Sequence, residues 1–310
     1  MLTGAVLIPD AVSEWNQRSQ GRTSTLAVYL TTAEIETASE RSNGRKDTLG
    51  SSNGLLVFGE APLEKSMKLT FLGSGDAFGS GGRFNTCMMV ETTTSRFIID
   101  CGASSLIAMK RAGITPNSIE TILVSHLHGD HFGGLPFFIL DAQFFSKRTV
   151  PLTVAGPPGM RERLTAAMEV FFAGSSQTPQ KFELRIVELE PGRSHDLPGL
   201  MVTPYLVNHA CGAPPLALRI EADGRTLSYS GDTEWTEALI DAGRGADLFV
   251  CEAYFFDRQV KFHLDLASLE RHLHEIQPKR LVLTHMGADM LAHLDAVAHE
   301  TAADGKTFEV

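Results

Sequence analysis

The stretch that decides the fold is TILVSHLHGDHFGGLPFF, residues 121–138. Its apolar start predicts a buried strand, and the polar hexapeptide HLHGDH stands where that strand ends. Alternate residues of an extended chain point the same way, so His126 and His128 can converge on one metal ion. The glycine that follows lets the chain turn and present Asp130 and His131 in another direction. The hexapeptide therefore predicts ligands for two neighbouring ions, against the alternative of a polar surface loop.

Three more polar residues stand where other apolar strands stop, the position from which separate strands deliver side chains to one sheet edge. His209 follows MVTPYLV, Asp232 follows TLSYS within SGDT, and His285 follows RLVL within THMG. A strand-end Asp before Thr is also typical of a helix N-cap, so Asp232 taken alone is ambiguous. Taken with the hexapeptide, the chain order and spacing favour a binuclear metal site.

The composition excludes several classes of protein. The chain has 310 residues, 43% of them hydrophobic, and 27 Lys and Arg against 37 Asp and Glu, a formal net charge of −10. This balance argues against a broad basic surface for nucleic acid. The four cysteines form no CxxC pair, which argues against a disulfide framework. With no apolar run of about 18 residues and no signal-peptide pattern, we expect a globular cytoplasmic protein without membrane insertion.

The composition changes near Met67. Residues 1–66 are rich in Ser, Thr, Gly and Asn and predict a poorly specified or flexible N-terminal extension, whereas 67–310 predict the folded domain. The domain keeps 21 Lys and Arg against 29 Asp and Glu, so its net charge is −8. The acidic balance therefore belongs to the domain itself.

Strand-like and helix-like segments alternate after Met67. We expect strands at 67–72, 86–91, 96–100, 121–125, 151–155, 183–188, 201–207, 215–221, 225–230, 247–252 and 280–284. We expect helices at 104–112, 132–147, 159–173, 233–243, 265–276 and 288–298. This order predicts an α/β fold of two βα halves, with the sheets packed together and the helices outside.

Several of these sequence motifs resemble those of a known family. HLHGDH, a His after a strand, GDT and THMG are similar to the metallo-β-lactamase superfamily, and the likeness extends over 67–310. LGSGDAFGSGGRFNTCMMVE, IIDCG, HGDHFGGLPFF, YSGDT, CEAYFF and KFHLDL resemble its ribonuclease Z and phosphodiesterase branch. The resemblance implies a four-layer αβ/βα sandwich and a metal-dependent hydrolase.

The resemblance also implies a role for each site residue. One metal is held by His126, His128 and His209, the other by Asp130, His131 and His285, with Asp232 bridging them; Asp130 and His263 are catalytic, His263 as proton donor to the leaving oxygen. The alternative for His263 is a packed residue preceding an Asp265 helix cap. Nitrogen and oxygen ligands suit two Zn²⁺ ions, with Mn²⁺ or iron as alternatives.

The favoured function is hydrolysis of a small phosphodiester by a hydroxide that bridges the two ions. Between 151–155 and 183–188 the sequence lacks the long glycine-rich and basic arm with which ribonuclease Z grips transfer RNA, so a nucleic acid partner is disfavoured. tRNA 3′ processing and a lactone, thioester or sulfate-ester hydrolase are the alternatives, ahead of a non-hydrolytic iron enzyme or an inactive metal-binding member. We expect a small anionic ester as substrate, contacted by Arg83 of the glycine-rich loop at 73–84. A homodimer is one option for the assembly of the protein.

Overall fold

The computed structural model describes residues 66–310. The N-terminal extension predicted for 1–66 lies, apart from Ser66, outside the described residues. Within residues 66–310, none of the helices combines the length and the apolar character that crossing a bilayer requires.

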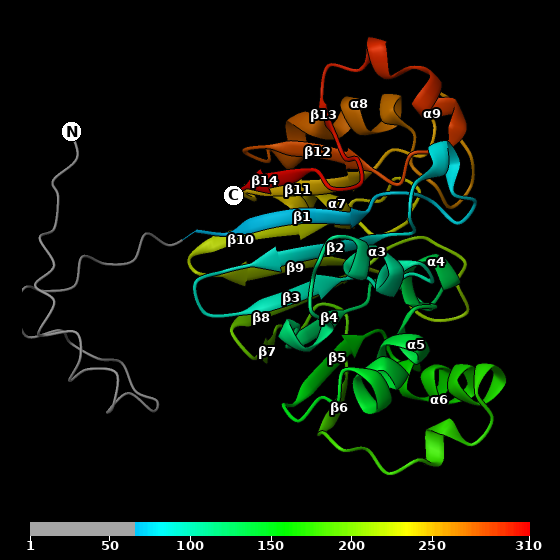
Figure 1. The fold of residues 1–310 in the computed structure, drawn as a ribbon. Helices are drawn as coiled ribbons and strands as arrows, with labels where there is room; N and C mark the ends of the chain where they lie inside the picture. Colours follow the sequence, from blue (N-terminus) through cyan, green and yellow to red (C-terminus); the bar gives the residue numbers. More distant parts are fainter. Residues whose placement is uncertain (1–65) are drawn as a thin grey trace, which may run out of the picture. The chain divides into compact units, whose positions relative to one another are not determined.

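Two seven-stranded sheets form the centre of the domain (Figure 1). The first has the order β14-β1-β2-β3-β4-β5-β6, with β1 Lys68–Gly73, β2 Cys87–Glu91, β3 Arg96–Ile99, β4 Thr121–Leu123, β5 Leu152–Gly156, β6 Leu184–Glu188 and β14 Thr307–Glu309. The second has the order β13-β12-β11-β10-β9-β8-β7, with β7 His195–Leu197, β8 Leu200–Leu206, β9 Leu216–Ala222, β10 Arg225–Tyr229, β11 Leu248–Glu252, β12 Leu281–Thr284 and β13 Glu300–Thr301.

Helices cover the outer face of each sheet. On the first sheet lie α3 Ser105–Arg111, α4 Gly129–Phe132, α5 Leu135–Leu140, the π-helical turn η3 Asp141–Phe145 and α6 Met160–Phe171. On the second lie α7 Ala238–Gly243, α8 Leu266–Ile276 and α9 Ala288–Ala292. Short turns complete the set: η1 Ser80–Gly82, η2 Pro116–Ser118, η4 Ser175–Gln177 and η5 Leu294–Ala296.

Successive residues of one strand enter different cores. Phe97 and Ile99 of β3 lie in the cluster between the two sheets, whereas Ile98 packs with α3 and α5 residues such as Met109 and Phe138. Both faces of the strand are buried, which explains why it reads as a continuous apolar run. A third core lies between the second sheet and α7 to α9. The four-layer αβ/βα sandwich that the resemblance implied is confirmed.

Several strands run in the same direction, so their carboxyl ends lie at one edge of the sandwich. Strands β3 to β6 run parallel, as do β10 to β13. Residues that follow the carboxyl ends of β4, β10 and β12 therefore meet at one edge of the sandwich. These are the hexapeptide and the segments of Asp232 and His285.

The eleven expected strands are all present, with bounds within two residues of the prediction. Strands β7, β13 and β14 were missed because each has only two or three residues and no distinct apolar pattern. The single helix expected over 132–147 is instead α5 and η3, preceded by a break at Gly133 and Gly134.

The helix expected to begin at residue 233 starts five residues later, at Ala238. The amide of Thr233 donates to Glu252 Oε2, and the amide of Glu234 donates to the carbonyl of Asn208. Both amides thus bond to residues at the ends of neighbouring strands and not within a helix. Residues 233 and 234 therefore belong to the site, and the helix begins after them.

Candidate metal centre

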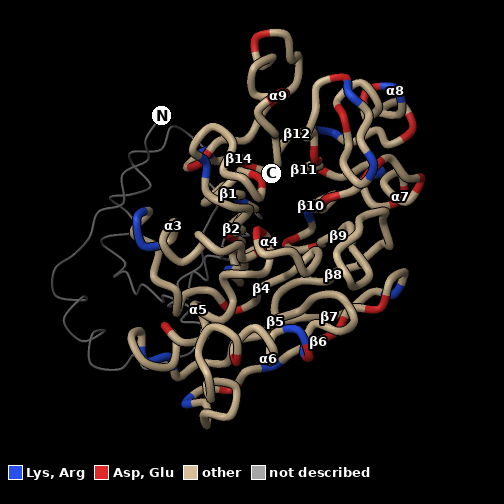
Figure 2. The backbone as a smooth tube through the Cα atoms, turned by 90° about the vertical axis from the view of Figure 1, so that its right-hand side faces the viewer, with Lys and Arg blue, Asp and Glu red and all other residues tan. Residues whose placement is uncertain are grey.

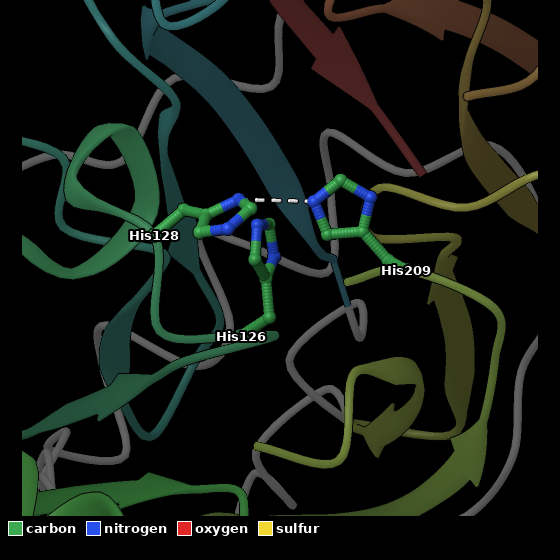
Figure 3. A group of neighbouring side chains, drawn as sticks. All are labelled: His126, His128 and His209. Atoms are coloured by element: carbon green, nitrogen blue, oxygen red, sulfur yellow. Dashed lines mark hydrogen bonds between the residues drawn. The ribbon is translucent and has the colours of Figure 1, made fainter. Parts of the chain in front are cut away.

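Three imidazole rings form the first group. His126 and His128 follow β4, His209 follows β8, and all three rings turn toward one another (Figure 3). One ligand atom from each lies within 4.8 Å of the others. His128 Nδ1 lies 3.0 Å from His209 Nε2. Three nitrogen donors therefore surround one small volume.

Two carboxylates and two imidazoles form the second group. Asp130, His131, Asp232 and His285 are all buried, and their ligand atoms also lie within 4.8 Å of one another. His131 Nε2 is 3.3 Å from both Asp130 Oδ2 and Asp232 Oδ1. His285 Nε2 is 3.1 Å from Asp232 Oδ2.

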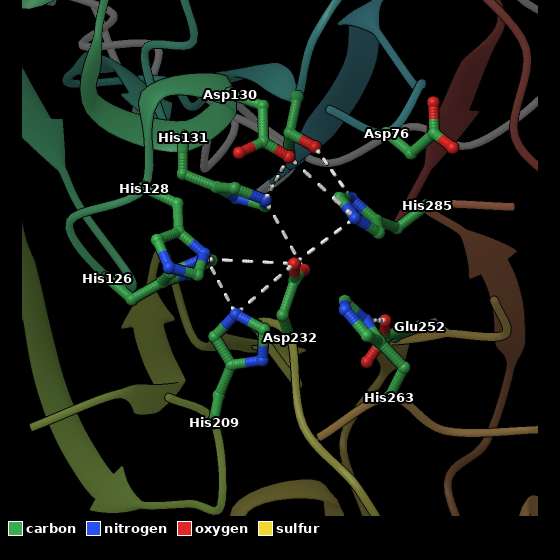
Figure 4. A network of polar contacts seen from close by, with 12 residues as sticks. Asp76, His126, His128, Asp130, His131, His209, Asp232, Glu252, His263 and His285 are labelled. Carbon is green, nitrogen blue, oxygen red and sulfur yellow. Dashed lines mark hydrogen bonds and ion pairs between the residues drawn. The ribbon is translucent and has the colours of Figure 1, made fainter. Parts of the chain in front are cut away.

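Asp232 stands between the two groups (Figure 4). Besides its contacts in the second group, its Oδ2 atom lies 3.8 Å from His126 Nε2 and 4.0 Å from His209 Nε2. The structure thus brings together all seven residues that the sequence predicts as metal ligands, with Asp232 where a bridging ligand would stand. Their roles as ligands stay a prediction.

The polar atoms of these groups fit bound cations. Within residues 66–310, His126 Nε2, His131 Nε2 and Asp232 Oδ1 are buried and have no hydrogen-bond partner. A buried polar atom without a partner costs about 1–3 kcal/mol, so three around one volume need a further group to interact with. Imidazole nitrogens and carboxylate oxygens without thiolates are a donor set that suits Zn²⁺ at a catalytic site.

Burial and neighbouring charges set the protonation of the rings. Burial lowers the pKa of His126, His209 and His285, which favours the neutral imidazole that binds metals. Burial also acts on His131, but the charges of Asp232, Asp130 and Asp100 outweigh it and raise its pKa. Burial would raise the pKa of Asp232, but the charge and hydrogen bond of His131 outweigh it and hold that pKa well below its usual range.

A ring of supporting contacts orients the ligands. Asp100, which the sequence places at a strand end, lies 2.7 Å from His131 Nδ1 and accepts from the amide and hydroxyl of Ser125. Thr86 lies 3.3 Å from His285 Nδ1. Partners of this kind fix which ring nitrogen faces the metal.

Two glycines let the hexapeptide approach the end of β3. A Cβ atom on Gly102 would lie 2.1 Å from the carbonyl oxygen of Asp130, and one on Gly134 would lie 2.3 Å from the carbonyl oxygen of Gly102. Any side chain at either position would displace the hexapeptide from Asp100.

His263 lies beside the second group, on the loop before α8. Its Nδ1 atom is 2.6 Å from Glu252 Oε1, and Glu252 is fully buried at the end of β11. Asp232, Glu252, His263 and His285 form a third set of ligand atoms within 4.8 Å, which shares two residues with the second. Asp265 caps α8 by accepting from the amide of Ser268, so His263 does not cap that helix itself.

The charges around His263 favour its protonated form. Burial lowers the pKa of His263, but the hydrogen bond and charge of Glu252 outweigh it, so the net shift is upward. Burial and the charge of Asp232 raise the pKa of Glu252 to about 8. The Glu252–His263 pair therefore retains a proton at neutral pH.

Sequence reasoning did not single out Glu252 as a site residue. The signal was present, because the apolar strand LFVCE ends on a carboxylate, and Asp100 and Asp232 likewise stand at or just after the ends of apolar strands. It also missed the carbonyl of Phe262, which lies 2.9 Å from His209 Nδ1. No residue-type pattern could have revealed that contact, because it involves the backbone.

The glycine-rich loop at 73–84 is held by two carboxylates. Asp76 accepts from the amides of Phe78 and Ser80, and Asp304 accepts from the amides of Ser74 and Phe84. These amides are therefore engaged within the protein. Arg83 donates to the carbonyl of Ala302 at 3.0 Å, and its predicted contact with substrate stays a prediction.

Comparison with known proteins identifies the family. Residues 67–304 match the family described as anti-Pycsar protein Apyc1. Ribonuclease Z of Methanosarcina acetivorans is 27% identical over 274 residues, covering 72% of this chain and 88% of the relative. Ribonuclease Z of Bacillus thuringiensis strain Al Hakam is 28% identical over 279 residues, covering 72% and 89%.

Solved structures share the fold. The metallo-β-lactamase fold protein YhfI of Bacillus subtilis matches with a TM-score of 0.63 and 19% identity, covering 79% of this chain and all of that one. Human tRNase Z, short form, gives 0.63 and 24%, covering 78% and 98%. Zn²⁺-bound PqqB of Methylobacterium extorquens gives 0.61 and 16%, covering 78% and 100%. The match over residues 67–304 shows that the chain belongs to the anti-Pycsar protein Apyc1 family, and with the ribonuclease Z relatives and the shared fold it is a metal-dependent hydrolase of the metallo-β-lactamase superfamily.

Proposed function

We propose that this protein hydrolyses a small phosphodiester, such as a cyclic nucleotide or a similar ester, with two divalent cations bound at the site. The observation that carries the proposal is the pair formed by the buried Glu252 and the half-buried His263 beside the metal groups. An alkoxide is a poor leaving group, so its departure benefits from a positioned proton donor.

The seven predicted ligands would hold the cations. His126, His128 and His209 would hold one, Asp130, His131 and His285 the other, and Asp232 would contact both. When bound, two such cations supply a water of lowered pKa and positive charge facing the phosphoryl oxygens. Zn²⁺ is the ion that this donor set favours. The structural neighbour PqqB is also Zn²⁺-bound.

His263 would deliver the proton at its Nε2 atom. Its Nδ1 is engaged by Glu252 Oε1, so the other nitrogen is free to face the leaving oxygen. The Glu252 carboxylate is itself fixed by the amide of Thr233, next to Asp232. Hydrogen bonds thus connect the proposed proton donor, through Glu252, to the segment that carries Asp232. Proton transfer requires such fixed positions of the donor and the reacting group.

The connection between β5 and β6 supports a small substrate. It consists of α6, the turn η4 and their short links, a compact segment within the described residues. Lys and Arg lie interspersed with Asp and Glu on the outer helices and loops of residues 66–310 (Figure 2). A tRNA-binding surface needs a dense basic stripe instead.

tRNA 3′ processing is the second candidate. The observation in its favour is the similarity to the ribonuclease Z relatives, which extends over 72% of this chain. It requires the same ligands and the same proton donor, so the site alone does not separate the two substrates. Thioester hydrolysis uses the same cations but has less need of a proton donor, because a thiolate is a better leaving group than an alkoxide. Lactone and sulfate-ester hydrolysis release an oxygen leaving group, so turnover of each substrate separates them from the proposed reaction.

Substrate turnover by the protein purified without added ions tests the proposal. We expect about two metal ions per chain and turnover of cyclic nucleotides and bis(p-nitrophenyl) phosphate that is lost in His128→Ala. In His263→Ala we expect turnover of cyclic nucleotides to be strongly reduced and turnover of bis(p-nitrophenyl) phosphate to be reduced less. His274→Ala, an exposed histidine on α8, is the matched control. Cleavage of precursor tRNA without turnover of small phosphodiesters would favour the second candidate, and preferred turnover of a lactone or aryl sulfate would refute both.

A further inference from the structure

Phe262 holds a backbone conformation that its side chain disfavours. Its φ angle is +74°, in the left-handed region where a bulky residue is strained. The strained peptide is held at both ends. The Phe262 amide donates to Glu234 Oε2 at 3.0 Å, and its carbonyl lies 2.9 Å from His209 Nδ1.

The contact with His209 bears on the metal site. A carbonyl can only accept, so Nδ1 of His209 must be the protonated ring nitrogen. The lone pair is then on Nε2, the atom that faces His128. The Phe262 carbonyl therefore selects the tautomer in which His209 can act as a ligand.

The same peptide also places the proposed proton donor. His263 follows Phe262 directly, and its amide donates to the carbonyl of Val260 across the tight turn. If Phe262 relaxed to a negative φ angle, the direction of its carbonyl and the path of the chain into His263 would change together. One backbone conformation thus serves both halves of the site.

Glu234 is well fixed for holding this conformation. It lies two residues after Asp232, and its own amide donates to the carbonyl of Asn208, the neighbour of His209. Its carbonyl accepts from the hydroxyl of Thr233 at 2.7 Å. A carboxylate that accepts from a backbone amide forms a stronger hydrogen bond than a neutral acceptor does.

We propose that Glu234 is a positioning residue, whose carboxylate holds Phe262 in the left-handed conformation and thereby orients both His209 and His263. The proposal rests on the proposed function for the role of His263. Its effect on His209 can be measured without any substrate.

Removing the acceptor should loosen the first metal group. In Glu234→Ala the Phe262 peptide loses its amide partner and can relax, so His209 is no longer held in one tautomer. We expect Zn²⁺ affinity to fall roughly 10- to 100-fold, the range found when a partner of a metal-binding histidine is removed. Glu234→Gln keeps an oxygen acceptor without the charge and should lose less.

A glycine at position 262 gives a test specific to this mechanism. Glycine adopts positive φ without strain, so Glu234→Ala/Phe262→Gly should recover Zn²⁺ affinity toward the level of Phe262→Gly alone. Alanine removes the phenyl ring but keeps the Cβ atom and the strain, so Glu234→Ala/Phe262→Ala should not recover it. A role of Glu234 that is only structural predicts no difference between the two double variants.

Two measurements read the result directly. Competition with a chelator gives the Zn²⁺ affinity, and ¹⁵N shifts of the His209 ring in the metal-free protein give its tautomer. Glu237→Ala, an exposed carboxylate at the start of α7, is the matched control and should match the unmodified protein in both. Thermal unfolding of each variant checks that it is folded.

The outcomes separate this proposal from the proposed function. Weakened Zn²⁺ binding and a mixed His209 tautomer in Glu234→Ala, restored by glycine but not by alanine, would support it. Unchanged affinity and tautomer in Glu234→Ala, or equal recovery in both double variants, would overturn it. Failure of the unmodified protein to turn over phosphodiesters would refute the proposed function. The Zn²⁺ affinity and the His209 tautomer would still test the role of Glu234.

Discussion

Glu252 Oε1 lies 2.6 Å from His263 Nδ1, and this carboxylate is fully buried while the imidazole is partly open to solvent. The arrangement raises the pKa of His263 above its ordinary value, because the hydrogen bond and charge of Glu252 outweigh burial. The Nδ1 atom of His263 takes up the contact with Glu252, and Nε2 makes no hydrogen bond with the residues that the structure describes. Both features are what a general acid near neutral pH requires.

Glu252→Gln should move the alkaline limb of the pH–rate profile. The rate is expected to fall as pH rises through the pKa of His263, since the deprotonated ring has no proton to deliver. Removing the Glu252 charge lowers that pKa, so the fall should begin at lower pH. The profile of kcat against pH measures the shift.

Leaving-group dependence provides the control for that prediction. A p-nitrophenolate leaving group needs little protonation, so Glu252→Gln and His263→Ala should slow its release less than that of an alkoxide. An alkaline limb at the same pH in Glu252→Gln as in the unmodified protein would contradict the assigned role of the pair.

Asp100→Asn should weaken metal binding although it replaces none of the seven proposed ligands. Asp100 accepts from Ser125 and lies 2.7 Å from His131 Nδ1, so it holds the ring with Nε2 toward Asp232. An amide at this position loses the charge and can present its NH₂ group to the ring. We expect Zn²⁺ affinity to fall roughly 10- to 100-fold, measured by chelator competition.

The test of Asp100 has a matched comparison in the same protein. Asp196→Asn changes an exposed aspartate on β7, far along the second sheet from β10 and β12, and should leave Zn²⁺ affinity unchanged. Equal affinity in Asp100→Asn and the unmodified protein would show that His131 is oriented by packing alone.

Much of the fold could be predicted from the sequence, because strands buried on both faces leave long apolar runs. Phe97, Ile98 and Ile99 illustrate this, since each enters one of two cores. The convergence of His209, Asp232 and His285 was predictable because strand ends share an edge. β14 was not predictable, since its pairing with β1 joins residues far apart in the chain.

The parts of the site that escaped prediction depend on backbone geometry and burial. The Phe262 carbonyl contacts His209 only because of a positive φ angle at a phenylalanine, which no residue preference indicates. Glu252 escaped because a glutamate is usually exposed, and only the packed structure shows it buried beside His263.

Removing the metals should destabilise the folded protein measurably. A ligand that binds only the folded state at 100 times its dissociation constant stabilises that state by about 2.7 kcal/mol. For a domain of this size such a loss corresponds to about 5–10 °C in Tm. Thermal unfolding before and after chelator treatment checks this, and return of the original Tm on adding Zn²⁺ rules out damage by the chelator. No change in Tm would contradict metal binding at the seven residues.

Gly134→Ala should destabilise the hexapeptide through a backbone clash. Its Cβ atom would lie 2.3 Å from the carbonyl oxygen of Gly102 and 2.8 Å from that of Cys101, and neither backbone atom can move without shifting the end of β3. Gly129→Ala, also within this segment, serves as the control, because its Cβ atom would meet no atom of another segment within 4 Å among the described residues. We expect a loss of about 1–3 kcal/mol in the free energy of unfolding for Gly134→Ala and a much smaller change for the control, measured by urea denaturation. Since Gly134 also donates its amide to the Cys101 carbonyl, the same clash should separate Asp100 from His131 and lower Zn²⁺ affinity. Equal stability of the two variants would mean that the close approach of these two segments is not needed to hold the metal centre.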